Sequence, residues 1–313
     1  MARRGALPNF RQIIWRLTCL DRFTRRQLAS ATLSTPKYEY DIAGQRLLGD
    51  QEYAEAGRAA NEYSVSLING NDLRGSATLV SIGDIHGLLT ADHVWRFIRK
   101  GGAEDHFCMV LGSQMQRFEY PFEECTPIVI GEYSDKHEME GPDLTFIRLD
   151  NILKIGTIKS QKSFYPLDVE KGRMFDQMPY RECMWLIWGA PAEQSRKLVT
   201  ETGELVRKVT HFSGWSKFRE ITERSGFDYV TVTVPAGHLA FPTDFGGVSG
   251  GGVWIPFRFS EDPGGTVLKP ILSLFLAGVA YYQMKEAPSC TALTLHGKRS
   301  IYQRTISAVL QNR

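Results

Sequence analysis

The sequence predicts an all-β protein with two lobes, on two observations. Short segments rich in β-forming residues, separated by turn signals such as Asn69-Gly70 and Gly83-Asp84, occur in two series, which is typical of sandwiches and barrels. A less patterned stretch, residues 156–181, separates the two series and predicts a linker. The first series comprises residues 63–68, 75–80, 86–90, 107–111 and 144–149, and the second comprises residues 184–188, 197–200, 205–209, 229–234, 252–257 and 271–282.

The two ends of the chain differ from this β pattern. Residues 1–30 carry seven arginines and one acid, Asp21, and their apolar spacing with a capping-box pattern at Thr24 and Gln27 predicts two short helices. We expect a basic helical extension over residues 1–58, with a solvated face packed on the main domain. The alternative is a segment that docks an acidic regulatory partner or nucleic acid. Residues 298–312 predict a closing helix.

Composition excludes several classes. The chain of 313 residues has 37 basic and 35 acidic residues, a net charge of +2, which is too balanced for attraction of the whole molecule to nucleic acid or a membrane. Its five cysteines are scattered without a CxxC pair, and the histidines form no ligand pattern, so we expect no metal and no cofactor. No secretory signal is evident. These features together predict a cytoplasmic protein.

Three short segments carry the chemistry, and their order is the strongest signal. They surround His93, Asp143 and Ser249, at separations that leave room for one barrel on each side of a cleft. The order His, Asp, Ser is that of chymotrypsin-type enzymes and differs from the orders in subtilisins and α/β-hydrolases. An imidazole can deprotonate a serine hydroxyl near neutral pH, and a carboxylate can hold the imidazole in the required tautomer.

Residues 60–312 resemble the trypsin-like serine peptidase family, with bacterial and intracellular members closest. The resemblance rests on the segments Leu89-Thr90-Ala91-Asp92-His93-Val94, Asp143-Leu144-Thr145-Phe146 and Gly247-Val248-Ser249-Gly250-Gly251. It implies two antiparallel six-stranded β-barrels of the chymotrypsin-like kind. The expected domains are a first barrel over residues 59–155, the linker over 156–181, a second barrel over 182–297 and the C-terminal helix.

The resemblance also implies the activity and the site. We expect a serine endopeptidase that hydrolyses peptide bonds of intracellular proteins through an acyl-enzyme, with His93, Asp143 and Ser249 as the catalytic triad. The main-chain N–H groups of Gly247 and Ser249 would form the oxyanion hole. The substrate pocket would be lined by Thr243, Asp244, Tyr281, Tyr282 and Gln283.

Two departures from the family pattern affect these expectations. Val248 stands where secreted members carry the aspartate that pairs with a freed N-terminus, so the oxyanion loop must be ordered by other means. Thr243 stands about where a trypsin-type pocket aspartate would lie. Asp244, one residue later, still allows a basic preference beside an uncharged polar or aliphatic one. The role of Asp92 beside the histidine stays open.

Two other functions fit parts of the sequence. The chain could be a catalytically inactive trypsin-fold module that serves as a binding scaffold, because fold does not guarantee activity. The string from Gly247 to Gly251 also satisfies GxSxG, the nucleophile elbow of α/β-hydrolase esterases. That interpretation requires a helix after the serine, which Gly250, Gly251 and Gly252 disfavour.

Overall fold

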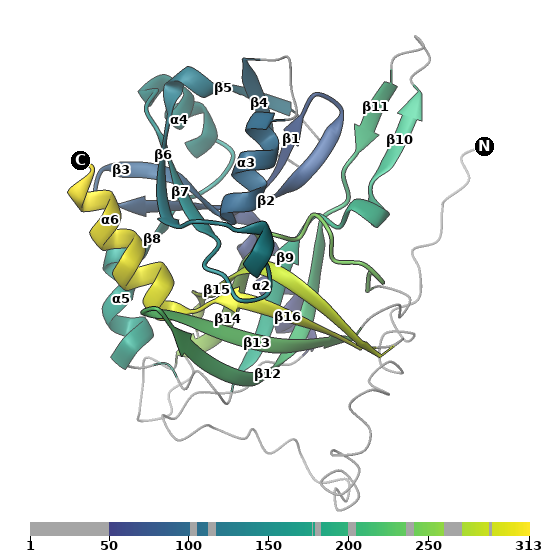
Figure 1. The fold of residues 1–313 in the computed structure, drawn as a ribbon, viewed down its shortest axis with the longest axis vertical. Helices are drawn as coiled ribbons and strands as arrows, with labels where there is room; N and C mark the ends of the chain where they lie inside the picture. Colours follow the sequence, from purple (N-terminus) through teal and green to yellow (C-terminus); the bar gives the residue numbers. More distant parts are fainter. Residues whose placement is uncertain are drawn as a thin grey trace, which may run out of the picture.

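The computed structural model describes residues 50–100, 105–111, 117–176, 178, 183–199, 205–235, 241–259, 271–287 and 290–313. Strands dominate these residues and form two lobes, drawn one above the other in Figure 1. The predicted all-β, chymotrypsin-like fold class is confirmed. The predicted helices of the basic extension lie outside the described residues.

The first lobe is a curled antiparallel sheet in the order β5-β4-β1-β2-β3-β7-β6, with the short strand β8 paired in parallel to β2. The path thus has seven strands where six were expected, and only the second lobe is a closed barrel. The bounds are β1 Ser64–Asn69, β2 Asp72–Ile82, β3 Ile85–Thr90, β4 His106–Val110, β5 Arg117–Pro121, β6 Cys125–Gly131, β7 Leu144–Leu149 and β8 Tyr165–Pro166.

The second lobe is a closed six-stranded barrel in the order β12-β13-β16-β15-β14-β9, as predicted. A separate hairpin of β10 and β11 projects away from the barrel, at the upper right of Figure 1. The bounds are β9 Met184–Gly189, β10 Arg196–Val199, β11 Leu205–Lys208, β12 Phe212–Arg224, β13 Phe227–Pro235, β14 Gly252–Phe259, β15 Ile271–Ala287 and β16 Cys290–His296.

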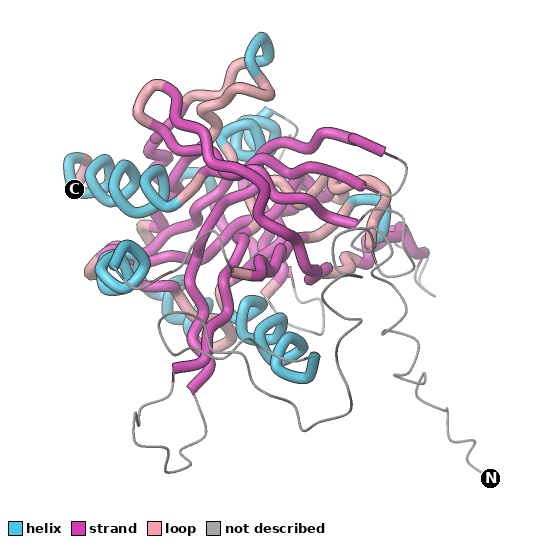
Figure 2. Tube along the Cα trace, turned by 90° about the horizontal axis from the view of Figure 1, so that it is seen from below, coloured by secondary structure: helices cyan, strands magenta, loops and turns pink. Residues whose placement is uncertain are grey.

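The strands make up the centre of the molecule, and most helices lie at its edge (Figure 2). The helices are α2 Asp50–Glu62, α3 Asp92–Lys100, α4 Ile152–Lys159, α5 Leu167–Asp176, and the π-helical segment η6 Arg299–Thr305, which continues into α6 Ile306–Gln311. Short 3-10 turns join strands: η3 Phe122–Glu124, η4 Asp135–His137 and η5 Ala192–Gln194. The segments η6 and α6 lie where the sequence predicts a closing helix. Each described helix is too short or too polar to cross a bilayer.

The expected linker, residues 156–181, carries parts of the fold. It includes the end of α4, the strand β8 and all of α5, and it leads from β7 of the first sheet to β9 of the barrel. Asn151 caps α4, with its side chain accepting hydrogen bonds from the N–H groups of Leu153 and Lys154. Of the lysines in this region, Lys159 and Lys171 lie on helices and Lys162 lies in the loop between α4 and β8.

Two hydrophobic cores meet across β2 of the first sheet. Ala77 and Leu79 pack into the core of the first lobe, under α3 and α4. Val80 and Ile82 pack with the barrel residues Trp185 and Trp254 in the larger core. The alternation of a strand therefore gives β2 one face for each lobe, and this shared strand holds the two lobes in a fixed relation.

Candidate active site

The chain positions His93 in the first turn of α3, directly after β3. Asp143 immediately precedes β7, which pairs with β3, so the two residues meet at one end of the same strand pair. The backbone N–H of His93 donates to Asp143 Oδ1 at 2.9 Å, and His93 Nδ1 lies 2.5 Å from Asp143 Oδ2. The buried carboxylate thus fixes both the position and the tautomer of the ring, leaving Nε2 for acid–base work.

The backbone of Asp143 is hydrogen-bonded to a second histidine, His296, at the end of β16 in the barrel. The N–H of Asp143 donates to His296 Nε2 at 3.0 Å. Complete burial lowers the pKa of His296 to about 4, because the charged imidazolium is poorly solvated there. His296 is therefore neutral near pH 7 and can accept this bond, which links the barrel to the backbone of Asp143 in the first lobe.

Asp92, whose role the sequence left open, anchors the segment that follows β6. Its carboxylate accepts from the N–H of Tyr133 at 2.9 Å and lies 2.8 Å from Arg96 Nε, one helical turn later. Burial raises the pKa of Asp92 above its ordinary value. Tyr133 is thereby held with its ring 5.4 Å from that of His93. Asp92 thus positions Tyr133, which lines the site.

Ser249 lies in a glycine-rich turn that leads into β14 of the barrel. Its hydroxyl donates to the carbonyl of Tyr281, at 3.5 Å. Gly247 and Gly250 have φ values of +92° and +83°, a backbone conformation that side chains disfavour. A Cβ atom on Gly247 would also come within 2.5 Å of the carbonyl oxygen of Ala190. Glycine is therefore required on both sides of the serine.

Two peptide groups in this turn are oriented by hydrogen bonds on their carbonyl side. The carbonyl of Gly246 accepts from the N–H of Ala192 at 2.7 Å, and the carbonyl of Val248 accepts from the N–H of Gly251 at 2.8 Å. Because C=O and N–H point in opposite directions across a trans peptide, these bonds also set the directions of the next N–H groups. Those are the N–H groups of Gly247 and Ser249, and neither meets an acceptor among the described residues.

Ser76, on β2 of the first lobe, orders this turn from the other side. Its hydroxyl donates to the carbonyl of Gly247 at 2.8 Å and accepts from the N–H of Ala190 at 3.0 Å. Its own N–H donates to the carbonyl of Ser249 at 2.9 Å. These uncharged hydrogen bonds hold the loop that contains Val248 and Ser249 against the first lobe.

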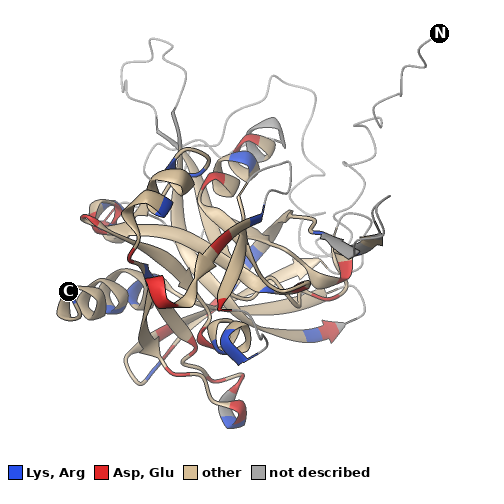
Figure 3. Cartoon of the chain, turned by 90° about the horizontal axis from the view of Figure 1, so that it is seen from above, with Lys and Arg blue, Asp and Glu red and all other residues tan. Residues whose placement is uncertain are grey.

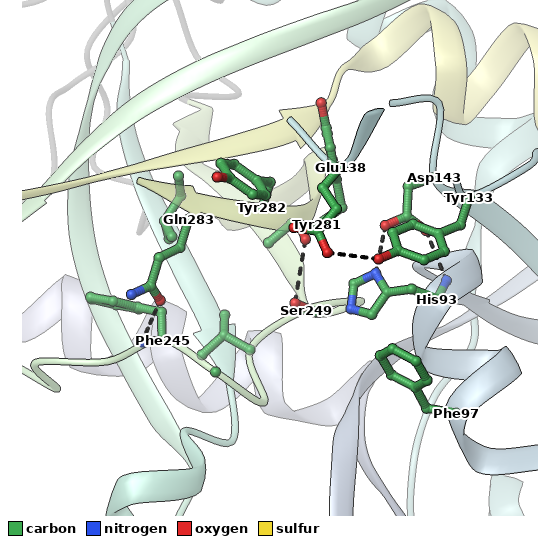
Figure 4. Close-up of a pocket in the computed structure, with 14 residues that line it drawn as sticks. His93, Phe97, Tyr133, Glu138, Asp143, Phe245, Ser249, Tyr281, Tyr282 and Gln283 are labelled. Carbon is green, nitrogen blue, oxygen red and sulfur yellow. Dashed lines mark hydrogen bonds and ion pairs between the residues drawn. The ribbon is translucent and has the colours of Figure 1, made fainter. Parts of the chain in front are cut away.

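These residues surround a cavity of about 250 Å³. Figure 4 shows first-lobe residues on one side, with His93, Phe97 and Tyr133, and barrel residues on the other. The ring of His93 faces Ser249 across it (Figure 4). The complete lining is His93, Phe97, Tyr133, Glu138, Asp143, Phe245, Gly246, Val248, Ser249, Ala280, Tyr281, Tyr282, Gln283 and Leu293.

The predicted pocket residues divide into two groups. Tyr281, Tyr282 and Gln283 line the cavity as expected. Thr243 and Asp244 do not line it, and both are exposed. Their backbone N–H groups donate to the carboxylate of Glu193, at 2.6 and 3.1 Å. This pairing holds the segment of Thr243 and Asp244 against the η5 turn, outside the lining of this cavity.

Several residues of the site were not found by sequence reasoning. Phe97 lies one helical turn after His93, and its ring is 5.7 Å from the histidine ring. If α3 had been predicted, the spacing of four residues would have indicated that Phe97 lies beside His93. Tyr133 donates from its hydroxyl to Glu138 at 2.8 Å, in a segment with no sequence signal. Ser76 and His296 reach the site only through the packing of two lobes, which no local pattern encodes.

The local structure at Ser249 separates two of the functions considered. The serine is followed by β14, an antiparallel barrel strand. A nucleophile elbow of the α/β-hydrolase type needs a helix at that point. The GxSxG interpretation is therefore wrong for this chain.

Comparisons with known proteins found similar chain paths among solved structures only. No protein-family model matches the sequence, and no curated protein matches it. Similar solved structures include neuropsin, a serine protease expressed in the limbic system of mouse brain, at 14% identity and a TM-score of 0.44, covering 81% of this chain and 95% of that one. The HtrA-type protease AlgW matches at 15% identity and a TM-score of 0.44, covering 83% of this chain. A serine endoprotease from Yersinia pestis matches at 13% identity and a TM-score of 0.41, covering 83%.

The last two matches span less than two thirds of the other chain, 64% and 65%. Similarities at such low sequence identity concern only the path of the chain. They leave the activity to be argued from the side chains of the site.

Proposed function

We propose that this protein is a serine endopeptidase with Ser249 as nucleophile, His93 as general base and Asp143 as the residue that orients the histidine. The observation that carries the proposal is the arrangement around one cavity: a carboxylate-held imidazole on one side, and a serine with two N–H groups lacking described acceptors on the other. These are the parts that acyl transfer requires.

The reaction follows from these positions. His93 Nε2 takes the proton of the Ser249 hydroxyl as its oxygen attacks the peptide carbonyl carbon, and Asp143 stabilises the imidazolium. The N–H groups of Gly247 and Ser249 stabilise the oxyanion of the tetrahedral intermediate. His93 then protonates the leaving amine, and an acyl-enzyme remains. Water, deprotonated by the same histidine, releases the acid.

A binding module without activity is the second candidate, and one observation favours it. The Ser249 hydroxyl donates to the carbonyl of Tyr281, and no hydrogen bond joins it to His93 among the described residues. That bond is long, at 3.5 Å, and catalytic hydrogen bonds in substrate-free sites often tighten only when substrate binds. We place catalysis first, because His93 and Ser249 line the same cavity.

The cavity walls support a preference for apolar side chains in the substrate. Phe245, Val248 and Leu293 are buried residues of the lining, and no lysine or arginine belongs to it. Its charged groups, apart from the histidine, are Asp143 and Glu138, and Asp143 is engaged by His93. We therefore propose peptide substrates with an apolar residue before the cleaved bond, with Glu138 at the rim.

Two finer parts of the proposal rest on the sequence. The scattered cysteines favour intracellular protein substrates. The arginine-rich part of the basic extension, residues 1–30, lies outside the described residues and is proposed as a docking segment for a regulatory protein partner.

The test combines labelling and cleavage. A fluorophosphonate probe should label the wild-type protein and leave Ser249→Ala unlabelled, and a peptide library should be cleaved by wild type while Ser249→Ala and His93→Ala lose nearly all activity. Labelling of a different residue, or equal cleavage by all three proteins, would contradict the proposal. Absence of labelling in a folded wild-type protein would favour the binding module.

A further inference from the structure

A group of three potential metal ligands lies on the first sheet, away from the cavity. One donor atom each from His106, Cys108 and Glu119 lies within 4.8 Å of the others. The three residues belong to β4 and β5, and β5 forms one end of the first sheet. They combine an imidazole nitrogen, a thiol sulfur and a carboxylate oxygen. That donor set is typical of zinc.

Strand geometry places these side chains on one face by construction. His106 and Cys108 are two residues apart on β4, so their side chains point the same way. Glu119 is the direct cross-strand partner of Cys108 in the antiparallel pair, and such partners share a face. The residues between them, Phe107 and Tyr120, point to the opposite face and are fully buried in the first-lobe core. The core thus fixes the backbone under the three donors.

The burial of the three donors suits a bound ion at a sheet surface. Cys108 is 5% exposed, whereas His106 is partly exposed and Glu119 is exposed. A metal ion would therefore have its sulfur ligand on the protein side. Its carboxylate ligand and a water molecule would lie on the solvent side. An open fourth position filled by water completes a tetrahedral zinc site.

A second carboxylate supports the assignment. Asp105 Oδ1 lies 3.1 Å from Nδ1 of His106. With the proton on Nδ1 held by Asp105, the lone pair of His106 is on Nε2. Metal-binding histidines usually donate their other ring N–H to a carboxylate or carbonyl in this way, which fixes the tautomer and orients the ring.

We infer that His106, Cys108 and Glu119 bind a zinc ion that cross-links the edge hairpin of the first sheet. The thiol of Cys108 loses its proton to solvent when the Zn–S bond forms, so binding weakens as the pH falls. No redox change is involved. The ion joins β4 to β5, the strand that lacks a second neighbour in the described sheet. The inference departs from the sequence analysis, which expected no metal, because these ligands match no linear motif.

Cobalt provides the sharpest test, since a thiolate bound to Co²⁺ gives a charge-transfer absorption in the near ultraviolet. The full chain, freed of metal, should take up one Co²⁺ with this absorption, and Zn²⁺ should displace it. Cys108→Ser should abolish the absorption. The matched control is Cys290→Ser on β16 of the barrel, a cysteine more exposed than Cys108, which should leave the absorption unchanged.

Affinity measurements keep the inference testable if Cys108→Ser fails to fold. Competition with a chromophoric chelator should show that His106→Gln and Glu119→Gln each weaken Zn²⁺ binding at least tenfold, and that Asp105→Asn weakens it about 10- to 100-fold. Zn²⁺ should also slow amide hydrogen exchange in β4 and β5 of wild type and not of His106→Gln. Wild-type affinity in these variants, or a charge-transfer band that survives Cys108→Ser, would overturn the inference. Phosphonate labelling of Ser249 is a separate readout, so the two proposals fail independently.

Discussion

The two lobes contribute to the site in different ways. The first lobe supplies ionisable side chains, Asp92, His93 and Asp143, each held by hydrogen bonds or an ion pair. The barrel supplies Ser249 and a turn whose working groups are backbone N–H groups. Basic and acidic residues are interspersed over both lobes (Figure 3), so the contrast is local to the site. One half of the site depends on side-chain identity, and the other depends on the absence of side chains.

Adding one carbon to the barrel turn should have the largest effect on activity. Gly247→Ala forces a side chain onto a residue with φ of +92°, against the carbonyl of Ala190, and so redirects the N–H that would stabilise the oxyanion. We expect kcat for peptide cleavage to fall about 10²–10³-fold. Steady-state kinetics measure this. Gly246→Ala is the control, because its new carbon would meet only the side-chain oxygen of Asp244, at 3.1 Å. Equal losses in the two variants would contradict the assigned role.

The histidine that joins the lobes should give the stability of the protein a pH dependence. The pKa of His296 falls from 6.5 to about 4 on folding, so the unfolded chain binds more protons between these values. The free energy of unfolding is therefore highest, with respect to His296, above pH 6.5, and it decreases by about 3 kcal/mol as the pH falls toward 4. Urea unfolding at a series of pH values should show a smaller loss for His296→Gln than for wild type. His86→Gln, at a partly exposed position, should change the profile less. Parallel profiles for wild type and His296→Gln would argue against this linkage.

A smaller effect is expected where the first sheet holds the barrel turn. Ser76→Ala removes the donor to the carbonyl of Gly247 and the acceptor for the N–H of Ala190, and should lower the free energy of unfolding by about 2 kcal/mol. It should also lower kcat more than it changes KM, since the turn loses order. Ser66→Ala is a matched control on the paired strand β1: Ser66 lies opposite Ser76, is fully buried, and its hydroxyl has no partner among the described residues. Similar results for the two variants would show that the Ser76 bonds do not matter.

The fold class could be predicted because strand periodicity is local. The two β series and the closing helix were found, whereas β5, β6, β12 and β16 were not placed in the strand series. Four helices of the described chain were also missed: α2, α3, α4 and α5. For α3 the reason is specific. The segment begins at Asp92, within the motif around His93, and its nine residues with four apolar positions are too few to establish a period.

The triad positions could be proposed from the sequence because each lies in a short motif and the order of the motifs is informative. Their supporting residues could not. Ser76, His296 and Tyr133 act through contacts between segments far apart in the chain, up to 171 residues for Ser76 and Gly247. Thr243 and Asp244 show the opposite case, in which a family-based position was expected in the pocket and Glu193 instead engages both residues.

The helix α2 sets a limit on where the chain can be cut. Ala56 and Ala60 on α2 are fully buried in the core shared with the barrel, and Tyr63, just after it, packs its ring 5.4 Å from that of Trp254. Residue 58, the predicted end of the basic extension, lies on this helix between the two buried alanines, with its own side chain exposed. Proteolysis there would divide the helix that packs on this core. Removal of the arginine-rich segment with this packing intact therefore requires a scissile bond upstream of Asp50.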